Sequence, residues 1–288
     1  MNNSINLHVK ETTLLLDFLM KQQGLSRNAA KGILARRQVL VNNTITSQYN
    51  CELKCGQVVQ ITKSGHKTLR SSMIDIVYED KYLLVINKHE GLLSIATERQ
   101  RVRTAYNILS DYLKASNKNA HIFIVHRLDR ETSGLMVFAK DESTKKHMQD
   151  DWHNIVTDRK YVAVLSGEIE KDRGMIVSWL KDNKCYVTYS SPQDNGGDKA
   201  VTRYNVIKRR NNYSLVELDL ETGRKNQIRV HMQDLQHPVV GDEKYGNGDN
   251  PLSRLALHAF KLCFYHPITH QLMEFETPYP PKFRKLFV

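Results

Sequence analysis

The stretch that decides the fold is residues 126–134, which read His-Arg-Leu-Asp-Arg-Glu-Thr-Ser-Gly. It lies between two short, continuously apolar runs, 122–125 and 135–139, and such runs indicate buried strands. A charge-dense loop between core strands is held at a sheet edge, where functional side chains tend to lie. Asp129 stands at its centre with an arginine on either side, and nearby guanidinium groups favour an ionised carboxylate. The loop is therefore either a functional site or a surface loop tied by its own ion pairs.

The composition indicates a well-packed core and a polyanionic partner. A chain of 288 residues has room for one large domain and a small one, and a hydrophobic content of 40% supports such a core. The net charge of +11 suits a polyanion, because each neutralised phosphate releases condensed counterions. Charge alone does not separate nucleic acid from acidic membranes. Residues 1–70 carry ten Lys/Arg against three Asp/Glu, so we expect the basic surface at the N-terminus.

We expect a soluble, cytoplasmic, monomeric protein without cofactors. The four cysteines form no CxxC pair, which fits free thiols in a reducing compartment. The N-terminus does not resemble a signal peptide, and the apolar cluster 14–20 is interrupted by Asp17 and too short for a bilayer. The absence of HExxH and of paired CxxC motifs predicts no metal site. The absence of Gly-rich phosphate loops likewise argues against ATP and NAD.

Residues 12–62 are predicted to form a compact module. A first helix capped by Thr12 or Thr13 ends at Gly24, and Ser26 caps a second helix. Two Asn residues at 42–43 between apolar runs predict a hairpin. The outside of the second helix carries four basic residues, which are Arg27, Lys31, Arg36 and Arg37. Taken alone, such a basic face is more often just solvated than a binding site.

The module resembles the S4 RNA-binding domain. The matching elements are Ser26-Arg27, residues 39–43 and residues 53–56, with departures at Arg37-Gln38, Asn43 and Gln57. The resemblance implies that the four basic residues bind RNA, mostly through phosphate contact and shape. Residues 63–72 lack periodicity and are rich in Ser, Gly and Lys, so we expect a linker that lets two domains hold one RNA.

From residue 73 to 288 the pattern predicts one domain with many strands. Strands are expected at 74–78, 82–86, 201–207 and 213–220, helices after Thr104 and from Asp141 or Ser143 to about 154, and loop and hairpin over 173–197. The polar segment Thr97 to Arg103 carries Arg99, Arg101 and Arg103. It could contact RNA or simply be mobile, and the sequence does not decide between the two.

Residues 126–135 resemble the H-R-L-D-x-x-T-S-G-L signature of the RluA-type pseudouridine synthases and match it at every specified position. Further segments resemble motifs of this family, namely 87–92 (N-K-P-x-G-L, with His89 in place of Pro), 159–167 (K-x-Y-x-A-x-V-x-G), 222–231 (T-G-R-x-x-Q-I-R-V-H), 255–259 and 264–267. Asn226 stands where His is commoner. The resemblance covers nearly all of 73–288.

The resemblance implies an α+β protein, in which the S4-like domain precedes a mixed, mainly antiparallel sheet flanked by helices and loops. The active site would lie in a basic cleft across that sheet. Asp129 would be the catalytic carboxylate, acting on a uridine that has left its stack. Whether it attacks the ribose, attacks the pyrimidine or abstracts a proton stays open.

The resemblance also assigns roles to four other side chains. Arg127 would fill the space that the base vacates, and Ile228 would line the pocket. Tyr161 would pack against the target ring, whereas without the family match a core aromatic is equally plausible. Arg229 would pair with Asp129, whereas an isolated Arg in a strand would more simply form a surface ion pair.

Three functions are compatible with these observations. The first is a pseudouridine synthase acting on large-subunit ribosomal RNA, because an S4 module ahead of this domain resembles members that do so. The second is a tRNA-directed synthase of the same family, and the third is a non-catalytic RNA-binding ribosome assembly factor. The joint presence of Asp129, Tyr161 and Arg229 favours an enzyme, because a pure binder would not need them.

Overall fold

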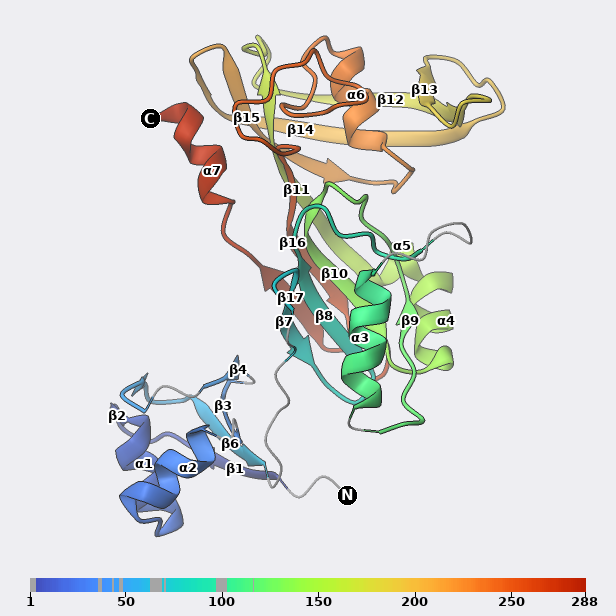
Figure 1. Ribbon diagram of the computed structural model, residues 1–288. Helices are drawn as coiled ribbons and strands as arrows, with labels where there is room; N and C mark the ends of the chain where they lie inside the picture. Colours follow the sequence, from blue (N-terminus) through green and yellow to red (C-terminus); the bar gives the residue numbers. More distant parts are fainter. Residues whose placement is uncertain are drawn as a thin grey trace. The chain divides into compact units, whose positions relative to one another are not determined.

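The computed structural model describes residues 4–35, 38–42, 44–46, 49–62, 69, 71–96, 103–115 and 117–288. The chain divides into two compact units, a smaller one of Met1–Arg70 and a larger one of Ser71–Val288 (Figure 1). The division falls within the segment 63–72 that the composition suggested as a linker, although most of that segment lies outside the described residues.

The smaller unit places two helices against a small sheet. Its elements are β1 (Ser4–His8), β2 (Thr13–Leu14), α1 (Leu15–Gln23), α2 (Arg27–Ala35), β3 (Val39–Val41), β4 (Thr44–Ile45), β5 (Glu52–Leu53) and β6 (Val58–Thr62). The sheet has the order β1-β6-β3-β4, and β2 pairs separately with β5. Leu15, Leu19 and Leu34 from the helices pack with Val59 of the sheet in one buried core.

Local signals in the smaller unit were mostly predicted correctly. Gly24 ends α1 with a φ of 60°, and the backbone N–H of Ala29 donates to the Ser26 hydroxyl at 3.3 Å. The predicted threonine cap of α1 is wrong. The helix follows Leu14 and has no side-chain cap, because the backbone of Thr13 is already engaged in β2, where it pairs with Leu53.

The larger unit is built on one sheet, in which eleven strands of the described residues take part. These strands are β7 (Ile74–Glu79), β8 (Leu83–Lys88), β9 (Phe123–Ile124), β10 (Ser133–Ala139), β11 (Val156–Ser166), β12 (Arg173–Asp182), β13 (Thr188–Ser191), β14 (Asp198–Arg210), β15 (Tyr213–Leu220), β16 (Leu257–Tyr265) and β17 (Leu272–Glu276). Their order is β13-β12-β14-β15-β11-β16-β10-β8-β7, with β9 on β10 and β17 on β16. Among these described strands, only β10 and β16 pair in parallel, so the predicted mixed, mainly antiparallel sheet is confirmed.

Helices accompany this sheet along its length. They are α3 (Ala105–Lys114), α4 (Glu142–Asp150), α5 (Trp152–Ile155), α6 (Gln227–Asp234), α7 (Pro281–Arg284) and the 3-10 turn η1 (Lys285–Phe287). Thr104 and Asp141 cap α3 and α4, as predicted, by accepting hydrogen bonds from the backbone N–H groups of Asn107 and Thr144. Helix α4 contacts β10, whereas α6 contacts β13 and β14 (Figure 1). Within the described ranges, no helix has both the length and the apolar character needed to cross a bilayer.

Two segments differ from the sequence expectation. The hairpin expected within 173–197 is present, because β12 pairs with β13, but residues 173–182 form a long strand that also pairs with β14 over eight residues. Arg229 lies on helix α6 and not on a strand. The buried residues Ile228, His231 and Met232 of this segment recur at the i, i+3, i+4 spacing of a helix.

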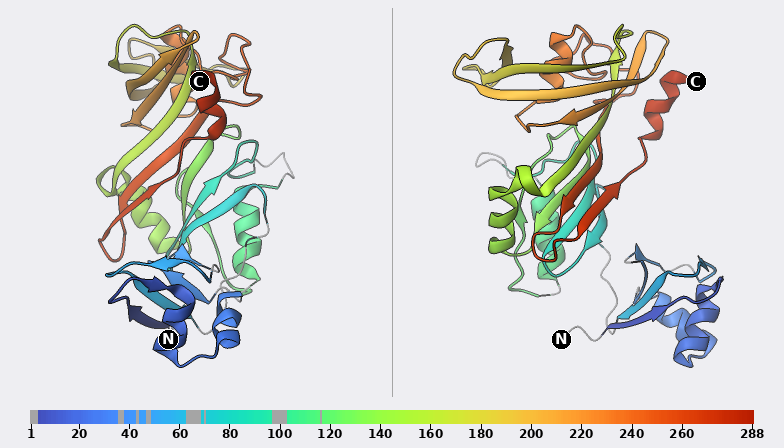
Figure 2. Two further views of the ribbon diagram at one scale, coloured as in Figure 1. Left: turned by 90° about the vertical axis from the view of Figure 1, so that its left-hand side faces the viewer. Right: turned by 180° about the vertical axis from the view of Figure 1, so that it is seen from behind.

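The register of three neighbouring strands brings distant parts of the chain together. Gly134 at the start of β10 lies opposite Ala259 of β16, and Tyr161 of β11 lies opposite the same Ala259 on the other side. The two views in Figure 2 show β11 and β16 running side by side through the larger unit. The loop that precedes β10 is therefore held close to Tyr161, although the two are about thirty residues apart in sequence.

Candidate active site

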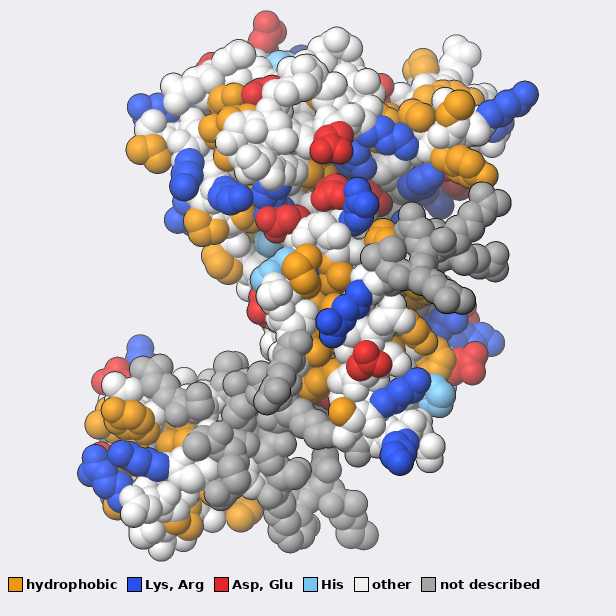
Figure 3. Space-filling view, viewed as in Figure 1, with side chains coloured by type: hydrophobic (Ala, Val, Ile, Leu, Met, Phe, Trp, Pro, Cys, Tyr) orange, Lys and Arg blue, Asp and Glu red, His pale blue; other side chains and the backbone are white. Residues whose placement is uncertain are grey.

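A cleft of about 440 Å³ opens in the larger unit. Its walls come from three segments and from Leu257 of β16; the segments are residues 125–132 before β10, residues 149–161 from α4 to β11, and residues 220–229 from β15 to α6. Figure 3 shows Lys and Arg side chains across the middle of this unit's surface, with Asp and Glu among them. The cleft contains all five of the residues predicted in the larger unit, namely Arg127, Asp129, Tyr161, Ile228 and Arg229.

The loop that carries Asp129 is fixed by buried polar side chains beneath it. The Lys88 ammonium is fully buried and donates to the carbonyl of Arg130 at 3.1 Å and to that of Leu92 at 2.8 Å. The Ser94 hydroxyl donates to the carbonyl of Leu128 at 2.7 Å and accepts from its N–H. Burial lowers the pKa of Lys88 to about 7, although the acidic residues Glu131, Asp129 and Glu90 raise it.

Contacts at the start of β10 explain Ser133 and Gly134 of the signature. The Ser133 hydroxyl lies 2.8 Å from Nδ1 of His258 and accepts from Arg254 at 2.7 Å. Gly134 has a φ of 124°, and a Cβ at this position would lie 2.2 Å from the carbonyl oxygen of Ala259. Only glycine fits where the two strands approach so closely, which explains the Ser-Gly pair of the motif.

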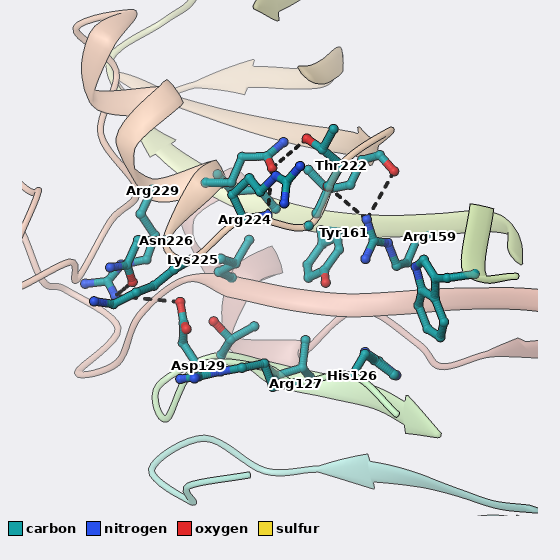
Figure 4. Close-up of a pocket in the computed structure, with 18 of the residues that line it drawn as sticks. His126, Arg127, Asp129, Arg159, Tyr161, Thr222, Arg224, Lys225, Asn226 and Arg229 are labelled. Atoms are coloured by element: carbon teal, nitrogen blue, oxygen red, sulfur yellow. Dashed lines mark hydrogen bonds and ion pairs between the residues drawn. The ribbon is translucent and has the colours of Figure 1, made fainter. Parts of the chain in front are cut away.

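Arg229 faces Asp129 across the cleft but binds another carboxylate more tightly. Its Nη1 lies 3.9 Å from Asp129, whereas Nε and Nη2 each donate to an oxygen of Asp242 at 2.7 Å. Nη1 also donates to the Asn226 side chain at 3.0 Å, and the guanidinium lies over the Tyr245 ring. Figure 4 shows Asp129 directed toward Arg229, Asn226 and Lys225.

The Arg229–Asp242 pair stays charged despite its burial. Burial opposes the charged form of each group, yet the hydrogen bonds between them outweigh it, so the pKa of Arg229 is raised and the pKa of Asp242 is lowered. Asp242 also accepts from the backbone N–H groups of Lys244 and Tyr245 at 2.9 Å. A fully satisfied buried pair of this kind holds the guanidinium in one place.

The apolar part of the cleft includes Tyr161 and Ile228, which are 7% and 4% exposed. Burial raises the pKa of the Tyr161 phenol, so the ring is neutral at physiological pH. Arg127, in contrast, is an exposed residue of the cleft wall, on the same loop as Asp129 (Figure 4). The cleft thus offers one carboxylate, an aromatic ring and flanking cations, which suits a planar base attached to a phosphate backbone.

The Thr-Gly-Arg segment before α6 is tied down by Gln227. Its side-chain oxygen accepts from the Thr222 hydroxyl at 2.8 Å and from the N–H of Arg224 at 3.0 Å. Its amide nitrogen donates to the Val201 carbonyl and the Thr202 hydroxyl on β14. Asn226 precedes the helix with a φ of 55°, a conformation that Asn tolerates better than most residues. These bonds aim Ile228 and Arg229 into the cleft.

Some contacts differ from the sequence expectation, and some groups were missed. Arg130 forms an ion pair with Glu131 at 2.5 Å. Asp129 forms its ion pair with Arg229 and not with its neighbours in sequence. Asp242 and Tyr245 were not predicted, because nothing in the sequence Gly-Asp-Glu-Lys-Tyr-Gly indicates that its first acidic residue is buried.

In the smaller unit Arg27 is exposed, and the Lys31 ammonium lies over the Tyr49 ring. Arg36 and Arg37 lie outside the described residues, as do Arg99 and Arg101.

Comparisons with known proteins agree with the sequence motifs. A family model described as RNA pseudouridylate synthase matches residues 82–234. The chain is 36% identical to the uncharacterized RNA pseudouridine synthase YhcT of Bacillus subtilis over 215 residues, which is 74% of this chain and 71% of that protein. It is 32% identical to the ribosomal large subunit pseudouridine synthase D of Pasteurella multocida over 279 residues, with 91% and 86% covered. Among solved structures, human RNA pseudouridylate synthase domain containing 1 matches with a TM-score of 0.59 and 26% identity, over 76% of this chain and 88% of that one.

The sheet, its cleft and these matches define an isomerase that acts on RNA. The chain belongs to the RNA pseudouridine synthase family, and the reaction predicted from its motifs, conversion of uridine to pseudouridine, is confirmed. The identity of the catalytic groups and of the RNA stays a prediction.

Proposed function

We propose that this enzyme isomerises uridines of large-subunit ribosomal RNA, with Asp129 as the catalytic carboxylate. The observation that carries the proposal is the position of Asp129, which lies in the cleft 3.9 Å from the fixed guanidinium of Arg229, with Tyr161 in the same cleft. The choice of RNA is supported by the similarity, over 91% of this chain, to a synthase named for the large ribosomal subunit.

The proposed chemistry needs the carboxylate and no cofactor. The N1–C1′ glycosidic bond of uridine breaks, the base turns, and C5 joins C1′, without net oxidation or hydrolysis. Asp129 would assist this cleavage either as a nucleophile or as a base. Arg229 would hold it in orientation, since the fixed guanidinium lies 3.9 Å away. Because Asp242 takes two of the guanidinium's donors, Asp129 retains an oxygen for the substrate.

The remaining cleft residues would bind the extruded nucleoside. Tyr161 offers a ring against which the pyrimidine can stack, and Ile228 closes the apolar wall. Arg127, exposed on the same loop as Asp129, would enter the space that the base leaves, because a planar guanidinium can stack on bases and also contact phosphates. Extrusion costs a few kcal/mol, which these contacts offset.

We propose that the smaller unit is an S4-like RNA-binding domain. Two helices against a small antiparallel sheet, with Arg27 exposed on α2 and Lys31 one turn further on, support this assignment. The excess of basic residues in 1–70 supports it independently. Two domains joined by a linker raise each other's effective concentration on one RNA, so modest contacts in each give firm binding.

Replacement of Asp129 tests the catalytic assignment. We expect Asp129→Asn to bind an unmodified large-subunit rRNA transcript as the wild type does and to form no pseudouridine. Glu131→Gln is the matched control, because it removes a negative charge from the same loop at a residue that pairs with Arg130. Pseudouridine formation by the Asp129→Asn enzyme would show that another group is the catalyst.

The RNA target is tested separately by mapping. Carbodiimide-blocked primer extension on RNA from cells with and without the protein should show pseudouridine lost at defined large-subunit positions. Loss from tRNA alone would identify a tRNA-directed synthase. Full pseudouridine in both RNAs, together with association with assembling ribosomes, would favour the assembly factor.

A further inference from the structure

A second cation in the cleft, Arg159 of β11, has a setting unlike that of Arg229. Its Nη2 donates to two backbone carbonyls, that of Thr222 at 2.8 Å and that of Leu220 at 3.4 Å. Its guanidinium carbon lies 5.8 Å from the centre of the Trp152 ring. In Figure 4, Tyr161 lies between Arg159 and Asp129, so Arg159 occupies the far part of the cleft.

The backbone around Arg159 leaves room for this side chain. A Cβ added at Gly223 would lie 2.6 Å from Nη1 and 3.3 Å from Cζ of Arg159. Gly223 therefore allows the guanidinium to lie directly against the loop, with the Trp152 ring on another side. The head group of Arg159 is held in place before any ligand arrives, which lowers the entropy cost of binding one.

Arg159 also lacks a counter-charge. Other arginines of the larger unit pair with carboxylates, as Arg209 does with Asp172 and Arg254 with Glu90. Among the described residues no carboxylate forms an ion pair with Arg159, and none accepts a hydrogen bond from its Nε or Nη1. The pKa of the neighbouring His126 is lowered to about 3. Burial is the larger cause, and the positive charge of Arg159 is the smaller one.

We infer that Arg159, seated on Trp152, binds a backbone phosphate of the RNA next to the nucleotide that is isomerised. A half-buried cation without a counter-ion favours an anion, and the Nε–H and Nη1–H donors of Arg159, from which no described residue accepts, can bond the oxygens of a phosphodiester. The inference rests on the proposed function, because it places the target uridine near Asp129 on the other side of Tyr161. The phosphate of the RNA strand next to the extruded uridine then lies within reach of Arg159.

The salt dependence of RNA binding tests this subsite. For Arg159→Gln we expect weaker binding of a short oligouridylate, and a slope of log Kobs against log [KCl] that is smaller by about 0.7, the value for one phosphate contact on a single strand. Lys171→Gln is the control, since it removes an exposed charge that does not line the cleft. An Arg159→Gln slope equal to that of the wild type would overturn the inference.

Arg159→Lys separates phosphate binding from a structural role in holding the 220–223 loop. A phosphate contact needs the charge, so the lysine variant keeps the slope of the wild type while the slope of the glutamine variant is smaller. If the loop contacts alone mattered, the two variants would bind equally weakly with an unchanged slope. All slopes are measured in the Asp129→Asn background, so they do not depend on catalysis. A failed catalytic assignment appears instead as pseudouridine formed by Asp129→Asn alone.

Discussion

Arg229 binds both oxygens of Asp242 at 2.7 Å while its remaining nitrogen lies 3.9 Å from Asp129. One guanidinium thus serves two carboxylates in different ways. The buried carboxylate of Asp242 fixes the position of the guanidinium. Asp129 in the cleft lies near the positive charge of the guanidinium but forms no short hydrogen bond with it. A carboxylate placed this way keeps its lone pairs accessible, which is what a nucleophile or a base requires.

Asp242→Asn should therefore damage both stability and catalysis. Removing one partner of a buried ion pair leaves an uncompensated charge, and such changes cost about 3–5 kcal/mol of unfolding free energy. We also expect kcat to fall, because Arg229 is no longer held toward Asp129. Urea unfolding and steady-state kinetics measure the two effects. Asp182→Asn, which breaks the more exposed pair with Lys225, should cost at most about 1 kcal/mol; equal losses in both variants would contradict the proposed role.

Gly134→Ala should be severely destabilising. The added Cβ would meet backbone atoms of Ala259 at 2.2 to 2.7 Å, and backbone cannot move aside as a flexible side chain can. The φ of 124° adds about 1–3 kcal/mol of strain. Gly248→Ala is the matched control, because Gly248 also has a positive φ but no atom within 4 Å of the added Cβ. Thermal melts should show a much larger loss for Gly134→Ala, and similar melting temperatures would disprove the steric explanation.

Gly134 also shows what the sequence could and could not predict. The signature Thr-Ser-Gly was recognisable, and with it the family, but the close approach involves Ala259, which is far away in the chain. Periodicity predicted the strands β7, β8, β14 and β15, because each of them pairs with a neighbour in sequence. A hairpin within 173–197 was predicted, but the length of β12 was not, because its pairing with β14 rather than its own composition extends the strand.

In the candidate active site, too, residues within motifs were predicted, whereas contacts between distant parts of the chain were not. Asp129, Tyr161, Ile228 and Arg229 were predicted by resemblance and lie in one cleft. The groups that position them were not predicted. Burial of Lys88 and Asp242 depends on the complete fold, and polar residues of these types are usually exposed. Arg229 was expected on a strand, whereas the buried residues of its segment have helical spacing.

Replacing Tyr161 by leucine should weaken catalysis through the loss of stacking. Base–aromatic stacking is worth about 1–3 kcal/mol, so kcat/KM should fall by roughly 5- to 150-fold. Tyr204→Leu is a useful control, because Tyr204 is equally buried at 7% exposure but does not line the cleft. If both variants lose the same activity in proportion to their loss of stability, Tyr161 is a core residue without a role in binding the base.

Stability should fall in mild acid because of buried histidines. Burial lowers the pKa of His231 and of His258 to about 4, from an ordinary value of 6.5. Between these values the unfolded chain binds protons that the folded chain excludes, so unfolding free energy is lost as pH falls from 6.5 to 4. Each ring contributes about 1.4 kcal/mol per pH unit in this window. Urea unfolding at several pH values should show the slope, and His231→Gln should reduce it; an unchanged slope would mean that other groups cause the acid sensitivity.

The smaller unit gives the last prediction, which concerns the salt dependence of RNA binding. In the full chain, replacing Arg27 and Lys31 together by glutamine should weaken binding to an unmodified large-subunit rRNA transcript. The slope of log Kobs against log [KCl] should fall by roughly 0.7 to 0.9 for each phosphate that the variant no longer neutralises. Turnover of bound RNA should not change, because neither residue belongs to the larger unit that holds the cleft.

Lys21→Gln provides the control for this double variant. Lys21 lies on α1 of the same unit and is exposed, but its charge is already paired with Glu11 at 3.1 Å. Its removal should leave the slope nearly unchanged, since a neutralised cation releases few counterions from RNA. If the double variant also kept the slope of the wild type, the basic face of α2 would be a solvated surface. The phosphate contacts would then have to lie in the larger unit, where Arg127 and Arg159 line the cleft.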